Sequence, residues 1–463
     1  MYTPPGYNAG TPAPLLINLH GQGQIGDNLN MLINQPSDAT PAYLIANSQW
    51  PAARPFIVVS PQLKRDWAIP NVGDQDWVAS YIDEVVEYVK TQRNIDINKI
   101  YIMGLSLGGQ GCMIYSAAYP GKVAAMVPIC GRTDDIIQEG MACSLVNIPM
   151  WIFHGTEDIT LNYANATNMA AAINACPNPG SIKPHVTLMD AGEHTGVSVW
   201  NPLYNLTAGY PVYDWLLKFT KNSPANVAPY VNVGTDKKFL TTDATVYLFG
   251  DYFDDDGTIA SVQWTQTAGA ALTLQQTNTR ILKITNLLAG TFQFRLTVTD
   301  NLGAISTDDV TVELFGSVPM GMKSVTSLRL TNAAIGNIEI GSLVNEQVID
   351  KTILGTNDLN VRATMVGGGG SIVFKINGNQ YTRKLDGWSN PASFFVYPND
   401  AWYFPNGWKM LPGEHVVCAT PYTGSNGDGT SEISHCVKFS VINPILQNYY
   451  PKPGQDLSLL ASW

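Results

Sequence analysis

Charged side chains are scarce in this sequence. Of its 463 residues only 14% are charged, and 37 acidic side chains outnumber 26 basic ones, which gives a net charge of −11. Nucleic acids and anionic membrane surfaces attract cationic proteins, so this balance argues against both as partners. The sequence also has no apolar run of about 18 residues, the length that a membrane-spanning helix needs.

A visible signal peptide is missing as well. Met1–Gly6 leads directly into a strand-like run, so we expect a mature or trimmed chain. Glycine, proline and aromatic residues are plentiful, with 41 Gly, 29 Pro and 10% aromatic residues. Together with the low charge, this composition is typical of a secreted, β-rich protein, and we expect an extracellular monomer.

The six cysteines contain no C-x-x-C metal-binding pair. An even number of cysteines in a secreted protein favours disulfides. Cys418 and Cys436 flank a predicted hairpin, where a cross-strand disulfide would fit. Cys143 could pair with either Cys176 or Cys130, and the sequence does not choose between them.

The length predicts about three domains, and the pattern of elements places their boundaries. Residues 1–222 alternate strand-like and helix-like segments, which indicates a mainly parallel sheet with helices on both faces. Residues 223–317 and 318–443 consist of short alternating stretches without a helical period, which predicts two β-sandwich domains. We assign 444–463 to a tail or linker.

Apolar runs mark the expected strands of the first domain, at 15–19, 56–60, 99–103, 123–129, 150–153 and 185–189. The segment 76–92 has helical spacing, with Tyr81, Val85, Val86 and Val89 on one side. A parallel sheet of this kind carries its functional site at the carboxyl ends of its strands.

One strand end carries a serine between glycines. The run 99–103 is followed at once by Gly104-Leu105-Ser106-Leu107-Gly108 and then by a helix-like segment. Strand, G-x-S-x-G and helix in this order form a nucleophile elbow. The turn is too tight for side chains two positions either side of the serine. Gly104 and Gly108 have no side chain, so the backbone can make this turn without a steric clash. We expect Ser106 to be exposed in a strained conformation.

Two further strand ends carry an acid and a histidine. Asp158 follows the fifth strand and His194 follows the sixth, so serine, acid and histidine occur in the order of an α/β-hydrolase. His194 would take the proton of Ser106, and Asp158 would hold the imidazole in the required tautomer.

Other residues compete for these two roles. Glu157 is interpreted as a solvated loop charge, and Asp134 and Asp135 follow the fourth strand as less favoured acids. The remaining histidines are assigned structural or distant positions: His20, His154, His185, His415 and His435.

Backbone N–H groups complete the predicted site. Leu107 begins the helix after the serine, and Gln22 lies in the small-residue loop after the first strand. Both would donate to a developing oxyanion. Trp67, Trp200 and Tyr204 are candidates to line the substrate pocket, where aromatic faces would suit a sugar or a feruloyl ring. Plain packing is the preferred interpretation of each.

Several motifs support a family resemblance for residues 1 to about 220. They are Tyr2-Thr3-Pro4-Pro5-Gly6-Tyr7, Leu19-His20-Gly21-Gln22-Gly23, Phe153-His154-Gly155-Thr156-Glu157-Asp158, Gly192-Glu193-His194 and Tyr213-Asp214-Trp215-Leu216-Leu217. With the elbow, they resemble the α/β-hydrolase family that contains feruloyl esterases, acetyl xylan esterases and polyhydroxybutyrate depolymerases (carbohydrate esterase family 1 and relatives). The resemblance implies ester hydrolysis and is less specific for the substrate.

The second domain resembles a PKD-type immunoglobulin-like domain. The segments that carry the resemblance are Asp254-Asp255-Asp256-Gly257-Thr258-Ile259, Gln263-Trp264-Thr265-Gln266 and Phe294-Arg295-Leu296-Thr297-Val298-Thr299-Asp300-Asn301-Leu302-Gly303-Ala304. Trp264 is expected in the core of the sandwich. Asp254 and Asp256 could hold a structural Ca²⁺ through their carboxylate oxygens, although a hydrated turn is the preferred interpretation.

The third domain is rich in aromatic residues that could bind sugar or pack in its core. They are Trp388, Phe394, Phe395, Tyr397, Trp402, Tyr403, Phe404 and Trp408. Core packing is the preferred interpretation, and sugar binding is the hypothesis kept beside it.

These observations favour an extracellular serine esterase. It would remove acetyl or feruloyl groups from plant polysaccharide, or from an acylated oligosaccharide, through an acyl-enzyme and without a metal or organic cofactor. The first alternative is a polyester (polyhydroxybutyrate-type) depolymerase or a peptidase. The second is a non-catalytic carbohydrate-binding or adhesion protein, against which the intact serine, acid and histidine argue.

Overall fold

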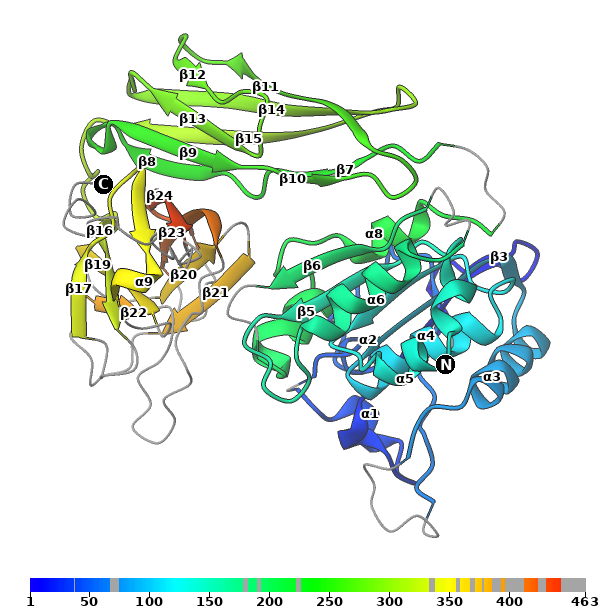
Figure 1. The fold of residues 1–463 in the computed structure, drawn as a ribbon. Coiled ribbons are helices and arrows are strands. Elements are labelled where there is room, and N and C mark those ends of the chain that lie inside the picture. The colour runs from blue at the N-terminus through cyan, green and yellow to red at the C-terminus, as the bar shows by residue number, and fades with distance from the viewer. Residues whose placement is uncertain are drawn as a thin grey trace, which may run out of the picture.

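A six-stranded parallel sheet forms the first part of the chain (Figure 1). The computed structural model describes residues 1–36, 38–66, 75–177, 182–189, 193–221, 226–332, 338–354, 359–366, 371–376, 379–384, 393–395, 412–423 and 430–442. In spatial order the strands are β2 (Ile57–Val59), β1 (Ala13–Leu19), β3 (Ile95–Leu105), β4 (Ala125–Ile129), β5 (Trp151–Gly155) and β6 (His185–Met189). Every neighbouring pair is parallel, so all six carboxyl ends lie at one edge.

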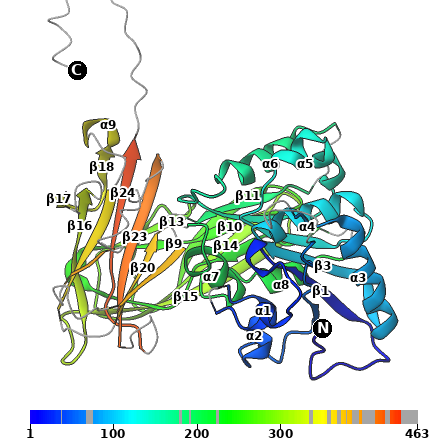
Figure 2. The same cartoon turned by 90° about the horizontal axis from the view of Figure 1, so that it is seen from below.

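Helices cover both faces of this sheet, as Figure 2 shows. They are α1 (Asn30–Ile33), α2 (Pro41–Ala46), α3 (Ala79–Gln92), α4 (Leu107–Ala118), α5 (Asp134–Gln138), α6 (Ala164–Asn174), α7 (Asn201–Tyr204) and α8 (Val212–Leu217). Alternate strand residues point to opposite faces. Ile100 and Ile102 therefore pack with α3, α4 and α6, whereas Tyr101 and Met103 pack with α2, α7 and α8.

The expected orientation of α3 needs one correction. The buried side chains of this helix are Ile82, Val86 and Val89, and Tyr81 is 55% exposed. Tyr81 therefore does not lie on the buried side with the valines. Tyr81 matched the helical spacing of apolar residues in the sequence. In the structure Ile82, and not Tyr81, occupies the position that faces the sheet.

The second part of the chain is a β-sandwich. One sheet contains β11 (Ile259–Ala268), β14 (Gly290–Asp300), β15 (Ile305–Phe315) and β8 (Lys237–Leu240), and the other contains β12 (Thr273–Gln275), β13 (Ile281–Thr285) and β9 (Thr245–Phe249). β10 (Asp251–Phe253) pairs with β7 (Tyr230–Asn232). Trp264 is 1% exposed between the sheets, where the sequence predicted a core residue.

The third part also has two sheets around one core. The first contains β17 (Ile338–Ser342), β16 (Ser324–Asn332), β19 (Leu359–Val366) and β22 (Ser393–Phe395). The second contains β18 (Gln347–Asp350), β24 (His435–Ile442), β23 (Gly413–Tyr422), β20 (Ser371–Ile376) and β21 (Asn379–Lys384), and the short helix α9 (Lys351–Leu354) follows β18. The aromatic candidates of this domain lie outside the described residues, apart from the backbone of Phe394 and Phe395.

The sandwich contacts both of its neighbours (Figure 1). On the first domain, Phe253 stacks on His185 with 3.5 Å between ring centroids, and Trp215 Nε1 donates to Asp255 over 2.8 Å. On the third domain, Tyr247 Oη donates to Glu346 over 2.8 Å. The second domain therefore shares buried contacts with both of the others.

Two disulfides close loops in the first and third domains. Cys418 pairs with Cys436 across β23 and β24, and Cys143 pairs with Cys176. Cys130 is a buried free thiol, which removes it as the partner of Cys143. Among the described residues, no helix is long and apolar enough to span a membrane.

Candidate active site

Ser106 lies in a sharp turn between β3 and α4. Its backbone has φ 53° and ψ −116°, a region that side chains other than glycine rarely adopt. A Cβ added to Gly104 would lie 2.6 Å from Gly108 O, and one added to Gly108 would lie 2.2 Å from Leu19 O. Both positions therefore exclude any side chain, for the steric reason that the sequence suggested.

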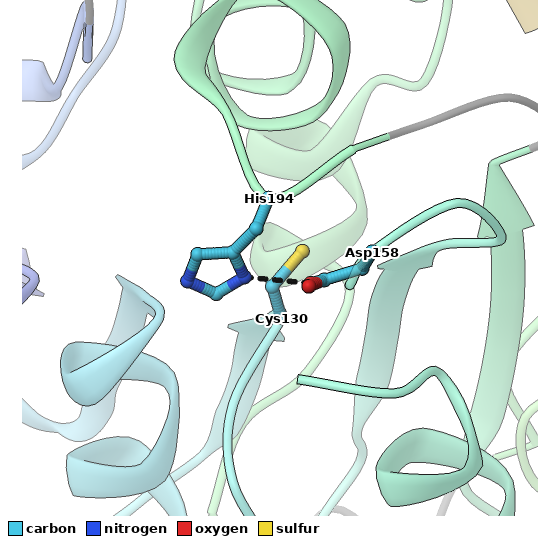
Figure 3. Close-up of side chains that lie close together, drawn as sticks. All are labelled: Cys130, Asp158 and His194. Carbon is cyan, nitrogen blue, oxygen red and sulfur yellow. Dashed lines mark hydrogen bonds and ion pairs between the residues drawn. The ribbon is translucent and has the colours of Figure 1, made fainter. Parts of the chain in front are cut away.

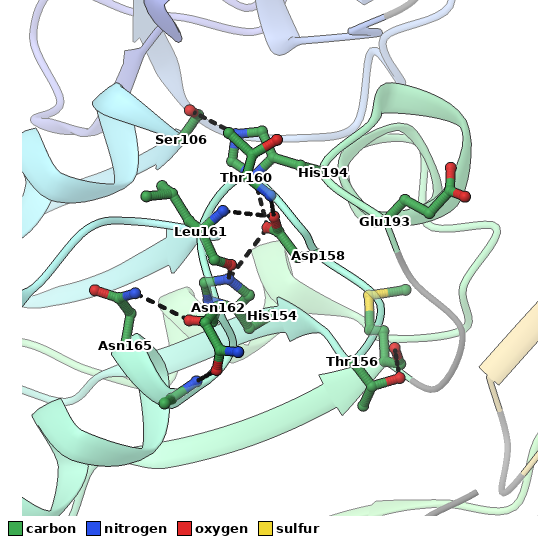
Figure 4. Close-up of polar contacts among 12 residues, drawn as sticks. Ser106, His154, Thr156, Asp158, Thr160, Leu161, Asn162, Asn165, Glu193 and His194 are labelled. Atoms are coloured by element: carbon green, nitrogen blue, oxygen red, sulfur yellow. Dashed lines mark hydrogen bonds and ion pairs between the residues drawn. The ribbon is translucent and has the colours of Figure 1, made fainter. Parts of the chain in front are cut away.

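The three residues predicted to act together lie within hydrogen-bonding distance (Figure 4). His194 Nε2 is 2.8 Å from Ser106 Oγ, and His194 Nδ1 is 2.6 Å from Asp158 Oδ2. An ionised carboxylate only accepts, so Nδ1 carries the proton and Nε2 accepts from the serine hydroxyl. This tautomer is the one in which the histidine can take the serine proton.

Further donors hold the Asp158 carboxylate in place. Its Oδ1 accepts the N–H groups of Thr160 (2.9 Å) and Leu161 (2.7 Å), and its Oδ2 lies 3.2 Å from His154 Nε2. Burial would raise the pKa of Asp158, but hydrogen bonds from His154 and His194 lower it to about 2. The carboxylate therefore stays charged and would stabilise an imidazolium at His194.

His154 thus has a contact that its sequence position did not reveal. Its Nε2 lies 2.7 Å from the carbonyl oxygen of Leu161, which only accepts, so this nitrogen carries the proton. The same N–H faces Asp158. The sequence placed His154 before a glycine at a strand end, but its contact with the acid depends on how the following loop folds back.

The thiol of Cys130 lies beside the acid and the histidine (Figure 3). Ligand atoms of Cys130, Asp158 and His194 all lie within 4.8 Å of one another, a spacing that could hold a metal. However, both nitrogens of His194 already have partners, and burial, with the charge of Asp158, raises the pKa of the thiol far above its usual range. Two members of this cluster, Asp158 and His194, are therefore the acid and the histidine of the predicted site.

The two predicted oxyanion donors flank the serine. Leu107 begins α4, where the first N–H groups have no partner within the helix. Gln22 follows Gly21, and a Cβ on Gly21 would lie 3.5 Å from Ser106 Cβ, so this loop packs against the elbow. The donor role of both N–H groups stays a prediction.

His20 fixes the loop that contains Gln22. Its Nε2 accepts the N–H of Leu63 over 2.8 Å, so its Nδ1 donates to Gly21 O over 2.6 Å. Burial lowers the pKa of His20 to about 4, which keeps the ring neutral near pH 7. The assignment of His20 to a structural position agrees with these contacts.

The aromatic candidates have different positions. Trp200 is 6% exposed, and its ring meets that of His194 edge-on with 5.2 Å between centroids. Its Nε1 donates to Asp38 over 3.3 Å. Tyr204 has 0% exposure and packs in the core, which agrees with the preferred interpretation of plain packing and not with its candidacy as a pocket residue. Trp67 lies outside the described residues.

The acidic turn of the sandwich contains buried oxygens without hydrogen-bond partners. Among the residues that the structure describes, these are both carboxylate oxygens of Asp254, Oδ1 of Asp255 and Oδ1 of Asp256. Oδ2 of Asp256 accepts the N–H of Val227 over 2.9 Å. Burial and the nearby Asp256 raise the pKa of Asp254 to about 6. Oxygen atoms of this kind suit Ca²⁺.

A family model described as "Putative esterase" matches residues 1–248, more than half of the chain. The chain belongs to this esterase family. A second model, which describes a PKD domain, matches residues 233–314. An esterase domain followed by a PKD-type domain, and the predicted α/β-hydrolase and β-sandwich fold classes, are therefore confirmed.

Individual relatives of this esterase-family chain match parts of it. A bifunctional acetylxylan esterase/xylanase from Neocallimastix patriciarum is 28% identical over 162 residues, which is 34% of this chain and 21% of the relative. A Dyslexia-associated protein KIAA0319 homolog from Rattus norvegicus is 33% identical over 98 residues, which is 21% of this chain and 9% of that protein. The chain thus spans about a fifth or less of these two relatives. A solved thermostable esterase has 23% identity and a TM-score of 0.37, covering 47% of this chain and 58% of the other.

Proposed function

We propose that this chain hydrolyses carboxylic esters through an acyl-enzyme on Ser106. The observation that carries the proposal is the continuous hydrogen-bonded series from Ser106 through His194 to Asp158, with heavy-atom distances of 2.8 and 2.6 Å. A serine hydroxyl becomes an effective nucleophile only when a base takes its proton, and this geometry supplies the base.

The steps follow from the contacts. His194 Nε2 takes the Ser106 proton while Oγ attacks the ester carbonyl carbon, and the carbonyl oxygen becomes an oxyanion. The N–H groups of Leu107 and Gln22 would stabilise it. His194 then donates the proton to the departing alcohol, which leaves an acyl-serine. Water, deprotonated by His194, releases the acid and restores the serine.

For the substrate we propose an acetyl or feruloyl ester on plant polysaccharide, hydrolysed outside the cell. The similarity to a bifunctional acetylxylan esterase/xylanase supports this class. The low charge and the two disulfides support an extracellular setting.

Hydrolysis of para-nitrophenyl acetate, methyl ferulate and acetylated xylan by wild type and Ser106→Ala tests the proposal. We expect kcat to fall by roughly 10⁴-fold or more in Ser106→Ala. Ser116→Ala is the matched control, because Ser116 lies buried in α4, the helix that follows Ser106, and its hydroxyl has no hydrogen-bond partner among the described residues. Activity that survives in Ser106→Ala would refute the acyl-enzyme. Wild type that leaves all three substrates intact would refute the substrate class.

A further inference from the structure

A cavity of about 50 Å³ lies where the three domains meet. The segment 208–210, which follows α7, forms one wall, and strands of the β-sandwich form another. β20 and β23 of the third domain close it. Two lysines line this space from different domains, Lys237 on β8 and Lys375 on β20.

Both lysine side chains line the cavity. Among the described residues, neither Lys237 nor Lys375 forms a salt bridge, whereas Asp251, the acidic residue of the wall, is paired with Arg280. Asp236 lies near enough to raise the pKa of Lys237, but its Oδ1 accepts the N–H of Thr311 over 2.8 Å. Asp236 therefore offsets part of the charge of Lys237, whereas the described residues that line the cavity give Lys375 no acidic partner.

This arrangement is unfavourable when the cavity contains only water. Burial lowers the pKa of Lys237 to about 7, and the charge of Lys375 lowers it as well. Burial also lowers the pKa of Lys375. Like charges in a partly buried space repel each other, and a negatively charged group between them would remove that cost and satisfy their N–H donors.

We propose that this cavity binds an oxyanion between Lys237 and Lys375. The ligand is a carboxylate or sulfate-like group, either free or carried by an acidic sugar. The space open to the centres of water-sized molecules is about 50 Å³, several times the ~10–15 Å³ that one water needs, so the cavity has room for a small anionic group. Because three domains form the walls, a bound anion would also hold their junction together. This inference does not depend on the proposed esterase activity.

Calorimetric titration of the full chain with sulfate, glucuronate and glucose, at equal ionic strength, tests the site. The variants are Lys237→Met and Lys375→Met, which keep the aliphatic bulk and remove the charge. Lys64→Met is the control, because Lys64 is exposed in the first domain and its loss changes the net charge equally. We expect wild type and Lys64→Met to bind an anion and not glucose. Each cavity variant should bind at least about tenfold more weakly.

The two anions distinguish the sources of the ligand. Binding of glucuronate alone indicates a carboxylate on an acidic sugar, and binding of sulfate as well indicates a general oxyanion site. Anion binding that is absent from wild type, or unchanged in both cavity variants, would overturn the proposal. A second measurement is independent of binding: without added anion, each cavity variant should unfold at the same temperature as wild type or higher. A lower temperature would mean that the lysines already make stabilising contacts, which also contradicts the site.

Discussion

Asp255 offers a sharp test of how the β-sandwich contacts the esterase domain. Its side chain is 3% exposed, its Oδ2 accepts from Trp215 Nε1 over 2.8 Å, and its Oδ1 has no hydrogen-bond partner in the part of the chain that the structure describes. Burial raises the pKa of Asp255 from 3.8 to about 7, against the lowering effects of the Trp215 hydrogen bond and the Lys218 charge. An ionised carboxylate at this contact is therefore unfavourable.

The direction of the pH dependence follows from this raised pKa. Between pH 3.8 and about 7 the unfolded chain loses this proton and the folded chain keeps it, so stability falls as the pH rises through this window. One pKa unit corresponds to about 1.4 kcal/mol, so the loss is at most about 4 kcal/mol. Asp255→Asn keeps an oxygen acceptor for Trp215 and cannot ionise, which removes the loss.

We therefore expect Asp255→Asn to gain stability relative to wild type as the pH rises from 4 to 8. Urea unfolding followed by tryptophan fluorescence at several pH values measures the difference. Asp27→Asn, at an exposed position, controls for the change in net charge and should show no such trend. A difference between Asp255→Asn and wild type that stays constant from pH 4 to 8 would refute the reasoning.

Three further predictions concern other sites. His154→Leu removes a donor to the acid of the active site, and kcat should fall by about tenfold. His154→Gln, which keeps an N–H donor, should recover most of that loss, whereas equal losses in steady-state kinetics would show that only packing matters. Gly108→Ala forces a Cβ to within 2.2 Å of a backbone oxygen and should cost about 3 kcal/mol or more in urea unfolding, while Gly121→Ala, whose Cβ meets nothing within 4 Å, should be tolerated. Calcium should raise the melting temperature relative to EDTA through the acidic turn 254–256, and identical melting curves would assign a hydrated turn.

The sequence by itself determined the candidate site because local rules act there. Apolar runs alternating with helical spacing require a parallel sheet, and a parallel sheet places every strand end at one edge. Ser106, Asp158 and His194 each follow such an end, so their proximity could be anticipated from the order of the elements. The steric role of Gly104 and Gly108 could also be predicted from the sequence, because a tight turn leaves no room for Cβ atoms.

Only the tertiary structure decided which distant side chains meet. The burial of Tyr204, the contact of His154 with Asp158 and the choice of Cys176 over Cys130 depend on how loops and helices pack, which no local period encodes. Lys237 and Lys375 are a further case, because they come from separate domains and line one cavity. The sequence does not show which charged side chains become neighbours when the domains pack. The spacing of apolar residues and glycines along the chain determines whether a segment forms a helix, a strand or a tight turn. Which segments contact one another is determined by the close packing of the whole chain.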